Sequence, residues 1–398
     1  MKVVVLGGAG AVGAVIVKHL VEYPEISEIV CADIAMERAK RLANGLRSSK
    51  LKVKRVNAAD FSSVLNALMD ADLVINSARP EWNLSIMDIA IETGTHYMDL
   101  AAEGLYKQLA RDDEWRKANL TALISVGEAP GLSNVFAKYA ADKLDKVDEI
   151  RIRDGYRIIS DEIIFTFAPD IAIEELLYKS VVYENGEFKR VPSMTGEEIY
   201  EFPEPVGPLK VYFANHEEPM TLPFFLGKKV KYVDFKMALS EREKQLVEIL
   251  WKLGLTSREP VEVKGVKVAP MDVVLACIRP PAELEPNFEG HEMIVTDVKG
   301  EKDGKRIRCI IYSYMSHREA YEKYGSHATA YMTGTSVAAA AIMLARGEIK
   351  RRGVFPAECL NAEKFLQQVQ KMGIKTVSYT HLRAHETSLH LVCRLLLE

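Results

Sequence analysis

A glycine pattern near the amino terminus limits what this chain can fold into. Residues 2–6 form a short β-branched run, the segment GGAGAVG follows, and helical periodicity comes next. The segment has the spacing G-x-G-x-x-G between a strand and a helix, which predicts a dinucleotide-binding βαβ unit. The first glycine permits a tight turn, the second lets a pyrophosphate approach the backbone, and the third lets the helix lie against the strand. We expect the phosphates to lie at the helix N-terminus, against Gly8, Gly10, Ala11, Val12 and Gly13.

The second predicted strand, residues 28–33, ends in an acidic residue. Asp33 lies about 20 residues beyond the glycine segment, where NAD-binding folds place the carboxylate that binds the adenosine ribose. Such a carboxylate accepts hydrogen bonds from both ribose hydroxyls and repels a 2′-phosphate. Arg38 and Lys40, on the next predicted helix, could accept a phosphate, which leaves NADP as the less favoured alternative. The sequence therefore favours NAD.

Strands and helices continue to alternate through the first third of the chain. Four more apolar runs, at 51–60, 71–78, 95–101 and 121–127, are separated by helical runs at 36–46, 61–69, 83–92 and 105–119. This alternation predicts an α/β fold of the Rossmann type, with a doubly wound parallel sheet. Ligands bind such sheets at the carboxyl ends of the strands. We therefore expect Asp60, Asn76 and Ser77, which end predicted strands, to contact the cofactor as well.

The pattern changes after residue 144. Residues 147–157 alternate polar and apolar side chains, and 179–193 and 290–315 read as hairpins around Asn-Gly and Lys-Asp-Gly-Lys. Helical runs at 171–178 and 241–253 intervene, and an Ala-rich helix follows at about 327–349. We predict an inserted α+β domain, built mainly on an antiparallel sheet, for substrate binding and dimerisation. The predicted boundaries are 1–127 and about 328–376 for the dinucleotide-binding domain and 128–327 for the inserted domain.

Composition argues against several classes of function. The net charge is −4, which gives no general attraction to nucleic acid or to an anionic membrane. No stretch of about 18 uncharged apolar residues predicts a membrane span. The five cysteines show no C-x-x-C spacing, so we expect reduced thiols and no metal site. The chain begins directly with a strand pattern, and we expect a cytoplasmic protein.

The last residues, 377–398, follow a natural stop at KMGIKT. They include three of the nine histidines, His381, His385 and His390. Residues 377–387 resemble the in-frame translation of a sequencing-library adapter. We therefore interpret this tail as an artefact rather than a metal site and leave it out of the fold prediction.

Four segments together resemble the saccharopine dehydrogenase family. They are VVVLGGAGAVG, DLVINSARPEWNLSIMDIAIETGTHYMDLA, GEAPGLSN and ATAYMTGTSVAAAAIMLARGEIKRRGVFP, and the likeness covers about 1–145 and 290–360. The resemblance implies a nucleotide-binding domain, an inserted substrate domain that forms a homodimer, and NAD(P)-dependent oxidation at a carbon–nitrogen bond. The chain departs from the family pattern at Arg79, Glu128 and Ser336, which bears on the substrate more than on the cofactor.

Amine oxidation by hydride transfer needs a base and a group that holds the amino-acid end of the substrate. As catalytic candidates the strand ends offer Glu128, Asp99 and His96. For each of them a structural role is the alternative. As substrate-binding candidates we take Arg79, Arg153, Gly131 and Thr335, because a guanidinium matches a carboxylate and a hydroxyl near a helix N-terminus can approach the substrate. His216 and His327 are weaker candidates.

These features predict an NAD(P)-dependent oxidoreductase that acts on an amino acid or its secondary-amine conjugate, as saccharopine dehydrogenase does. Two alternatives stay within this chemistry. One is a lysine 6-dehydrogenase, and the other is a carboxynorspermidine dehydrogenase-like reductase that joins a polyamine to an aldehyde. A third alternative, of another class, is a sensor that binds NAD(P) without turnover. Such a sensor would not need carboxylate and arginine side chains that converge beside the nicotinamide.

Overall fold

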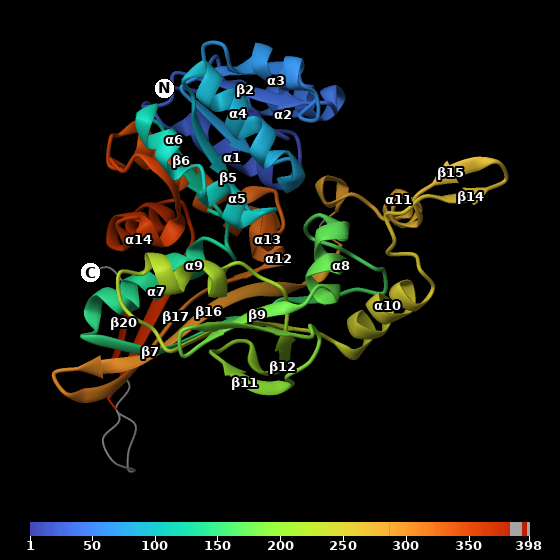
Figure 1. The fold of residues 1–398 in the computed structure, drawn as a ribbon. Coiled ribbons are helices and arrows are strands. Elements are labelled where there is room, and N and C mark those ends of the chain that lie inside the picture. Colours follow the sequence, from blue (N-terminus) through green and yellow to red (C-terminus); the bar gives the residue numbers. More distant parts are fainter. Residues whose placement is uncertain (286, 383–391, 396–398) are drawn as a thin grey trace.

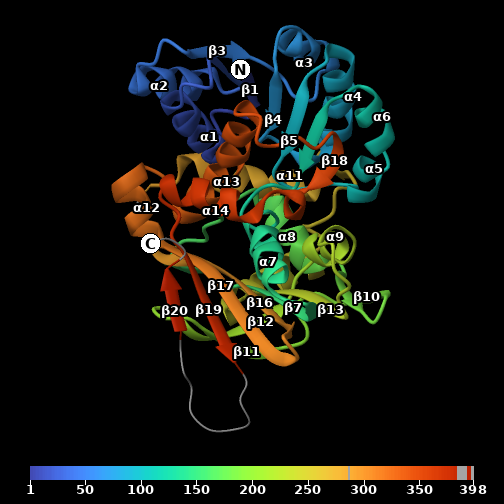
Figure 2. The same ribbon diagram turned by 90° about the vertical axis from the view of Figure 1, so that its left-hand side faces the viewer.

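The computed structural model describes residues 1–285, 287–382 and 392–395. Two sheets dominate the described part of the chain, one at each end of the molecule (Figures 1 and 2). A layer of helices lies between the carboxyl edge of the first sheet and one face of the second. This layer is where the two domains meet.

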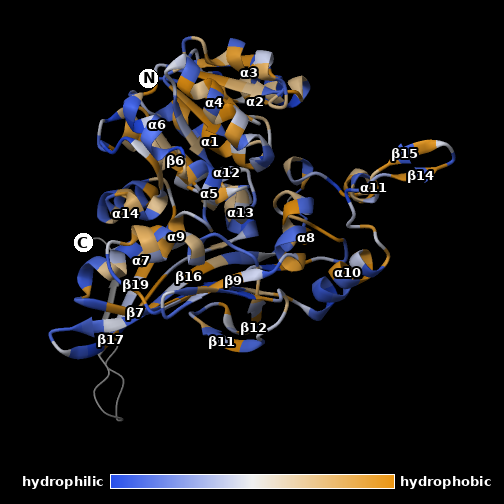
Figure 3. Cartoon of the chain, viewed as in Figure 1, coloured by the Kyte–Doolittle hydropathy of each residue, from blue (hydrophilic) through white to orange (hydrophobic). Residues whose placement is uncertain are grey.

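The first sheet has seven parallel strands in the order β18-β6-β5-β4-β1-β2-β3. Its central strands are buried on both faces, which explains their continuous apolar sequences (Figure 3). All six predicted strands are present, and the seventh, which the sequence analysis did not predict, comes from the far end of the chain. The strands are β1 (Lys2–Leu6), β2 (Glu28–Asp33), β3 (Leu51–Arg55), β4 (Leu73–Asn76), β5 (His96–Asp99), β6 (Thr121–Ile124) and β18 (Gly353–Pro356).

Helices cover both faces of this sheet. The face that carries Val3 and Val5 packs under the first helix and the long Ala-rich helix, and the face that carries Val4 packs under α3 and α4. Gly334 allows the close helix contact, because a Cβ there would lie 2.8 Å from the Val15 Cβ. The helices are α1 (Ala11–Glu22), α2 (Met36–Leu46), α3 (Phe61–Leu68), α4 (Asn83–Thr93), α5 (Leu105–Leu109), α6 (Asp112–Lys117) and α13 (Ala328–Ala345).

Helix α13 is long and apolar enough to cross a membrane by length and composition. Within the protein, however, 83% of its apolar window is buried. Its side chains pack against α1 and the sheet, as those of a core helix do.

The second sheet is mixed and has eleven strands among the described residues. Most pairs are antiparallel, as predicted, but β13 runs parallel to β7 in the middle of the sheet. The strands are β7 (Lys146–Asp154), β8 (Arg157–Ile159), β9 (Ser180–Glu184), β10 (Glu187–Val191), β11 (Glu198–Phe202), β12 (Gly207–Phe213), β13 (Tyr232–Ala238), β16 (Glu289–Lys302), β17 (Lys305–Ser316), β19 (Thr376–Leu382) and β20 (Val392–Leu395).

One face of the second sheet packs against helices, and the other face carries a smaller apolar cluster that includes Tyr200, Phe202 and Val295. On the inner face Ile150, Ile152 and Ile294 contact the apolar side of α7. A separate hairpin, β14 (Val261–Val263) with β15 (Val266–Val268), projects from the body of the protein (Figure 1). The remaining helices are α7 (Leu132–Lys143), α8 (Pro169–Leu177), α9 (Glu218–Phe225), α10 (Glu241–Lys252), α11 (Pro270–Cys277), α12 (His317–Tyr324) and α14 (Ala362–Lys371).

The chain crosses between the two sheets more than once. After β6 it passes through α7 into the second sheet, and after β17 it returns through α13 to form β18 beside β6. Residues 376–382, most of which we had placed in the artefactual tail, pair with β17. The candidate histidines at 385 and 390 lie outside the described residues.

Candidate active site

The strand order places a ligand site at the carboxyl edge of the first sheet. The order reverses between β1 and β4, and dinucleotides bind across the crevice at such a switch point. The ends of β1, β2 and β3 lie on the adenosine side of this point. The ends of β4, β5 and β6 lie on the nicotinamide side, where the second domain approaches them.

The glycine loop has the geometry that the sequence predicts. Gly7 has φ +71°, and a Cβ at Gly13 would lie 2.1 Å from the Gly7 carbonyl oxygen, so α1 packs directly on the turn. At Gly10 a Cβ would meet only the Gly7 oxygen, at 3.1 Å, so this residue leaves the space in front of the helix open. No side chain caps the helix here, and its first N–H groups have no partner within the helix. These features fit a dinucleotide pyrophosphate held by residues 8–13.

Asp33 ends β2 and holds the glycine loop in place. Its carboxylate accepts hydrogen bonds from the N–H groups of Ala9, at 2.9 Å, and Ala35, at 2.8 Å. The side chain is buried but keeps lone pairs for a ribose hydroxyl. Its contact with a cofactor stays a prediction.

The other predicted cofactor residues are held by the protein itself. Asp60 lies five residues beyond the end of β3 and caps α3 by accepting the Ser63 N–H, and its contact with a cofactor stays a prediction. Asn76 donates to the Arg79 carbonyl and to the side chain of Asn83. Ser77 donates its hydroxyl to Leu6 O. Asn76 and Ser77 therefore shape the end of β4, and their contact with a cofactor stays a prediction.

The loop after β6 is tight and directs Glu128 toward the second domain. Gly127 donates its N–H to Pro130 O at 2.8 Å. Gly131 has φ +130°, and a Cβ there would lie 2.4 Å from the Gly127 nitrogen. The predicted substrate residue Gly131 is thus required by the turn itself, while its contact with a substrate stays a prediction.

Glu128 joins two carboxyl groups from the inner face of the second sheet, Asp154 at the end of β7 and Glu292 on β16. The carboxyl groups of Asp154 and Glu292 lie close enough for one proton to bridge them, and burial raises the pKa of Asp154. Burial, and then the other carboxyls, raises the pKa of Glu128 and of Glu292 well above the usual range. Glu128 is 6% exposed, and its Oε1 has no hydrogen-bond partner. We call these three residues the carboxyl triad.

A second group of carboxylates surrounds a histidine beside the triad. His216 Nδ1 lies 2.8 Å from Glu218 Oε2, and its Nε2 lies 3.9 Å from Glu175 Oε1. The imidazole stacks on Phe235 with ring centroids 3.7 Å apart. Despite burial, the neighbouring carboxylates raise the pKa of His216 to about 9, so the ring is a cation at neutral pH. Glu217 accepts the Ala102 N–H at 2.6 Å and the Ser125 hydroxyl, at the ends of β5 and β6.

We call Glu175, Glu217 and Glu218, which surround His216, the histidine-linked carboxylates. Within the part of the chain that the structure describes, no lysine or arginine pairs with them or with the carboxyl triad. The site therefore holds six carboxyl groups against one imidazolium. Sequence reasoning missed Asp154, Glu175, Glu217, Glu218 and Glu292, because they lie on separate elements and share no motif.

The structure places the other two predicted catalytic residues, His96 and Asp99, at opposite edges of the first sheet. His96 begins β5, at the edge of the sheet opposite the site, and its Nδ1 accepts the Thr121 N–H. Asp99 lies at the correct edge, but it is 1% exposed and accepts hydrogen bonds from the Ser125 N–H and the Gln108 amide. Burial raises the pKa of Asp99 to about 6. The catalytic assignment of His96 is therefore corrected, while that of Asp99, which interacts electrostatically with Glu217 of the site, stays a prediction.

Two predicted substrate residues also point elsewhere. Arg153 is fully buried on the outer face of the second sheet, where it pairs with Asp234 and Glu198. Side chains alternate along a strand, so its neighbour Asp154 faces the site while Arg153 faces away. Thr335 is buried between α13 and α1 and lies 2.9 Å from the His19 ring nitrogen. Both assignments to the substrate are corrected.

Arg79 connects the two domains. It pairs with Asp170 at the start of α8, and Arg258 pairs with the same carboxylate. Arg79 is half-buried and lies directly after the end of β4. Its predicted contact with a substrate stays a prediction, and the observed pairing makes it a link across the domain boundary.

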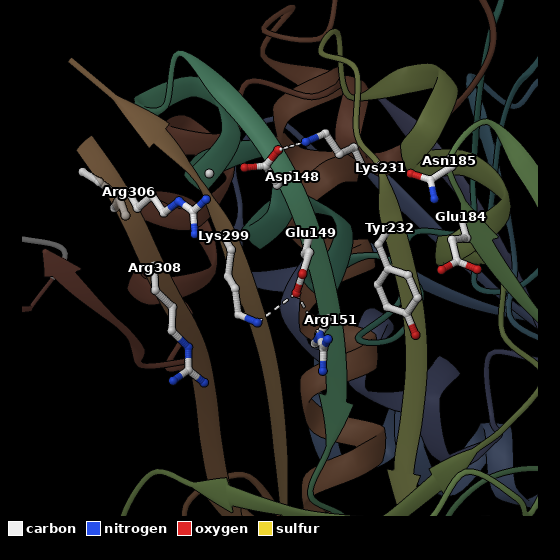
Figure 4. Close-up of a pocket in the computed structure, with 12 residues that line it drawn as sticks. Asp148, Glu149, Arg151, Glu184, Asn185, Lys231, Tyr232, Lys299, Arg306 and Arg308 are labelled. Atoms are coloured by element: carbon white, nitrogen blue, oxygen red, sulfur yellow. Dashed lines mark hydrogen bonds and ion pairs between the residues drawn. The ribbon is translucent and has the colours of Figure 1, made fainter. Parts of the chain in front are cut away.

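A separate hollow of about 580 Å³ lies on the outer face of the second sheet and contains none of the site residues (Figure 4). Its charged side chains largely pair with one another. Lys299 and Arg151 both contact Glu149, and Lys231 contacts Asp148. This pairing leaves little free charge for a ligand, and we place the active site between the domains.

The sequence matches two domains of one family. Residues 3–123 match the saccharopine dehydrogenase NADP binding domain, and residues 127–374 match the saccharopine dehydrogenase C-terminal domain. The chain belongs to the saccharopine dehydrogenase family. Its members' two-domain pattern agrees with the fold described above, and the chain is an NAD(P)-dependent oxidoreductase of the saccharopine dehydrogenase type.

Curated relatives of this family member are similar over nearly the whole chain. It is 31% identical to carboxynorspermidine synthase of Vibrio cholerae, over 92% of this chain and 94% of that one. It is 29% identical to carboxyaminopropylagmatine dehydrogenase of Synechocystis, over 94% and 96%. Among solved structures, saccharopine dehydrogenase (L-Glu forming) of Saccharomyces cerevisiae has a TM-score of 0.73 at 17% identity, covering 95% of this chain and 99% of that chain. The last similarity shows the shared fold.

Proposed function

We propose that this protein joins an amino-acid semialdehyde to a primary amine by reductive amination with a reduced nicotinamide dinucleotide. The printed names of the relatives support this choice within the family. Carboxynorspermidine and carboxyaminopropylagmatine share a carboxyaminopropyl group attached through nitrogen to an amine. Oxidising that carbon–nitrogen bond to an imine and hydrolysing the imine would give a four-carbon amino-acid semialdehyde and a primary amine in both cases.

The observation that carries the proposal is the carboxyl triad at the nicotinamide side of the switch point. Amine substrates are cations at neutral pH, and a buried carboxylate without a basic partner binds a cation. Burial raises the pKa of Glu128 and of Glu292 well above the usual range, and a carboxyl with a raised pKa suits general acid–base chemistry.

The residues of the triad supply the proton transfers that this reaction needs. A carboxylate takes a proton from the ammonium group, and the free amine then attacks the aldehyde carbon. A protonated triad member gives its proton to the hydroxyl of the resulting carbinolamine, which leaves as water and yields an iminium ion. When bound, the reduced nicotinamide supplies the hydride that reduces the iminium carbon. Amine, aldehyde, NAD(P)H and one proton thus give a secondary amine, NAD(P)⁺ and water.

We further propose NAD(H) as the cofactor, because Asp33 ends β2, where NAD-binding folds carry the carboxylate that binds the ribose and repels a 2′-phosphate. The residues at 8–13 would hold the pyrophosphate. We also propose that the protein is a cytoplasmic homodimer, as its sequence predicts.

The test uses the full chain and follows absorbance at 340 nm. NADH is mixed with aspartate semialdehyde and 1,3-diaminopropane, and the product is identified by its mass. Consumption of NADH only when both substrates are present, with one new carbon–nitrogen bond, would support the proposal. If no amine causes NADH consumption with the semialdehyde, and saccharopine or lysine reduces NAD, the proposal is wrong.

A further inference from the structure

We propose that Glu175, Glu217 and Glu218, arranged around His216, bind the distal ammonium group of a diamine substrate. This inference rests on the proposed function and specifies its amine. The carboxyl triad would then hold the reacting amino group, while the histidine-linked carboxylates hold the other end. A monoamine would fill only the first of these positions.

The two groups adjoin each other in the structure. Asp154 of the triad is close enough to interact electrostatically with both His216 and Glu218, and Glu175 interacts with Asp154. Glu217 connects the second group to the end of β6, the strand that precedes Glu128. One small molecule with two positive ends can therefore contact both groups.

The carboxyl groups of the site have no lysine or arginine partner among the residues that the structure describes. Burial raises the pKa of Glu217 to about 8 and of Glu175 to about 7, so these carboxyls hold protons in the ligand-free protein and can release them when a cation binds. His216 can neutralise only one of the resulting carboxylates. In the adjoining carboxyl triad, the Oε1 of Glu128 is buried without a partner, and buried polar atoms normally have partners. A bound cation would satisfy both the charge and this atom.

The hydrogen bonds favour an ammonium group over a guanidinium group. A guanidinium fork binds best when both oxygens of one carboxylate are free. Both oxygens of Glu217 and both oxygens of Glu218 already accept hydrogen bonds from the protein. An ammonium group has three separate donors and takes one remaining lone pair from each of several carboxylates.

The experiment compares kcat/KM for 1,3-diaminopropane, propylamine and agmatine with the same semialdehyde and NADH. Propylamine has the same carbon chain as the diamine but lacks the distal ammonium group. We expect the diamine to exceed propylamine by about 10- to 100-fold, the range for a hydrogen-bonded charge, and to exceed agmatine as well. Glu175→Gln should reduce the ratio of diamine to propylamine by about tenfold.

The matched control is Glu174→Gln, the preceding residue of α8, which pairs with Arg258 instead of His216. This variant should keep the ratio of the native protein. If propylamine and diaminopropane react equally well, or agmatine reacts best, the inference is wrong while the proposed function stands. If no amine reacts, the proposed function itself is wrong. Because kcat/KM for the three amines is compared in the native protein, this comparison tests the inference even if Glu175→Gln does not fold.

Discussion

The chemistry of this site depends on single side chains. Two residues that are neighbours on one strand can have different roles, one in the active site and the other in the packing of the sheet. Arg153 and Asp154 are neighbours, yet only Asp154 belongs to the carboxyl triad, while Arg153 pairs with Asp234 on the other face of the sheet. The sequence could not distinguish their roles. Both faces of β7 are covered at this end, so the alternation of its side chains does not show which face is turned toward the site. Glu128 was predictable from its place after a parallel strand. Glu292 was not, since its role depends on pairing between β16 and β7.

At the same scale we predict that Glu128→Gln lowers kcat by about 10²- to 10⁴-fold, because the triad loses a group that transfers protons. Binding of NADH, measured by fluorescence titration, should be unchanged. His96→Gln is the control and should leave kcat/KM within about threefold, since His96 lies at the opposite edge of the sheet. Equal losses in both variants would contradict the assignment.

Cofactor choice is a second prediction for one side chain. NADH should exceed NADPH in kcat/KM by about tenfold or more, because Asp33 repels the 2′-phosphate. Asp33→Asn should narrow this preference. A native protein that prefers NADPH would show that the carboxylate, held by Ala9 and Ala35, lies away from the ribose.

Elements of the first domain followed their sequence patterns closely. The strands and helices that carry the glycine loop formed as predicted, because each buries an apolar face with a clear period. One element of the first domain, β18, and one of the second, β13, did not. β18 is only four residues long, and β13 is parallel to β7, so both depend on contacts with distant strands. No local pattern encodes such pairing.

The packing of α1 on its loop gives a third prediction. Gly13→Ala should abolish NADH binding and destabilise the protein by about 1–3 kcal/mol, because the new methyl group overlaps the Gly7 carbonyl. Gly45→Ala, in α2, is the matched control, since a Cβ there meets nothing within 4 Å. It should stabilise the protein by about 0.5–1 kcal/mol. Urea unfolding monitored by circular dichroism measures both changes.

For the whole molecule, the buried acids predict a stability that falls as the pH rises. Burial raises the pKa of Glu175 to about 7 and of Glu217 to about 8, while His216 rises to about 9. All three bind protons in the folded protein that the unfolded chain has released, so each favours folding at low pH and loses this effect as its folded pKa is passed. The lowered pKa of His317, about 3, acts only below its unfolded value of 6.5.

We therefore expect the melting temperature of the ligand-free protein to fall by several degrees between pH 6.5 and 9. Glu217→Gln should make this slope shallower, because the amide does not titrate. Differential scanning fluorimetry across this range measures both proteins. A flat profile for the native protein would contradict the assigned pKa directions.

The return of the chain to its first sheet has a consequence for how the protein is made. The Thr121 hydroxyl at the start of β6 donates to the Arg351 carbonyl, 230 positions later, just before β18 completes the edge. Synthesis proceeds from the amino terminus, at about 5–20 residues per second. While the ribosome translates the intervening domain, the nascent dinucleotide half exposes the open edge of β6 and the bare apolar side of α1. During that interval we expect chaperones to bind this half of the chain.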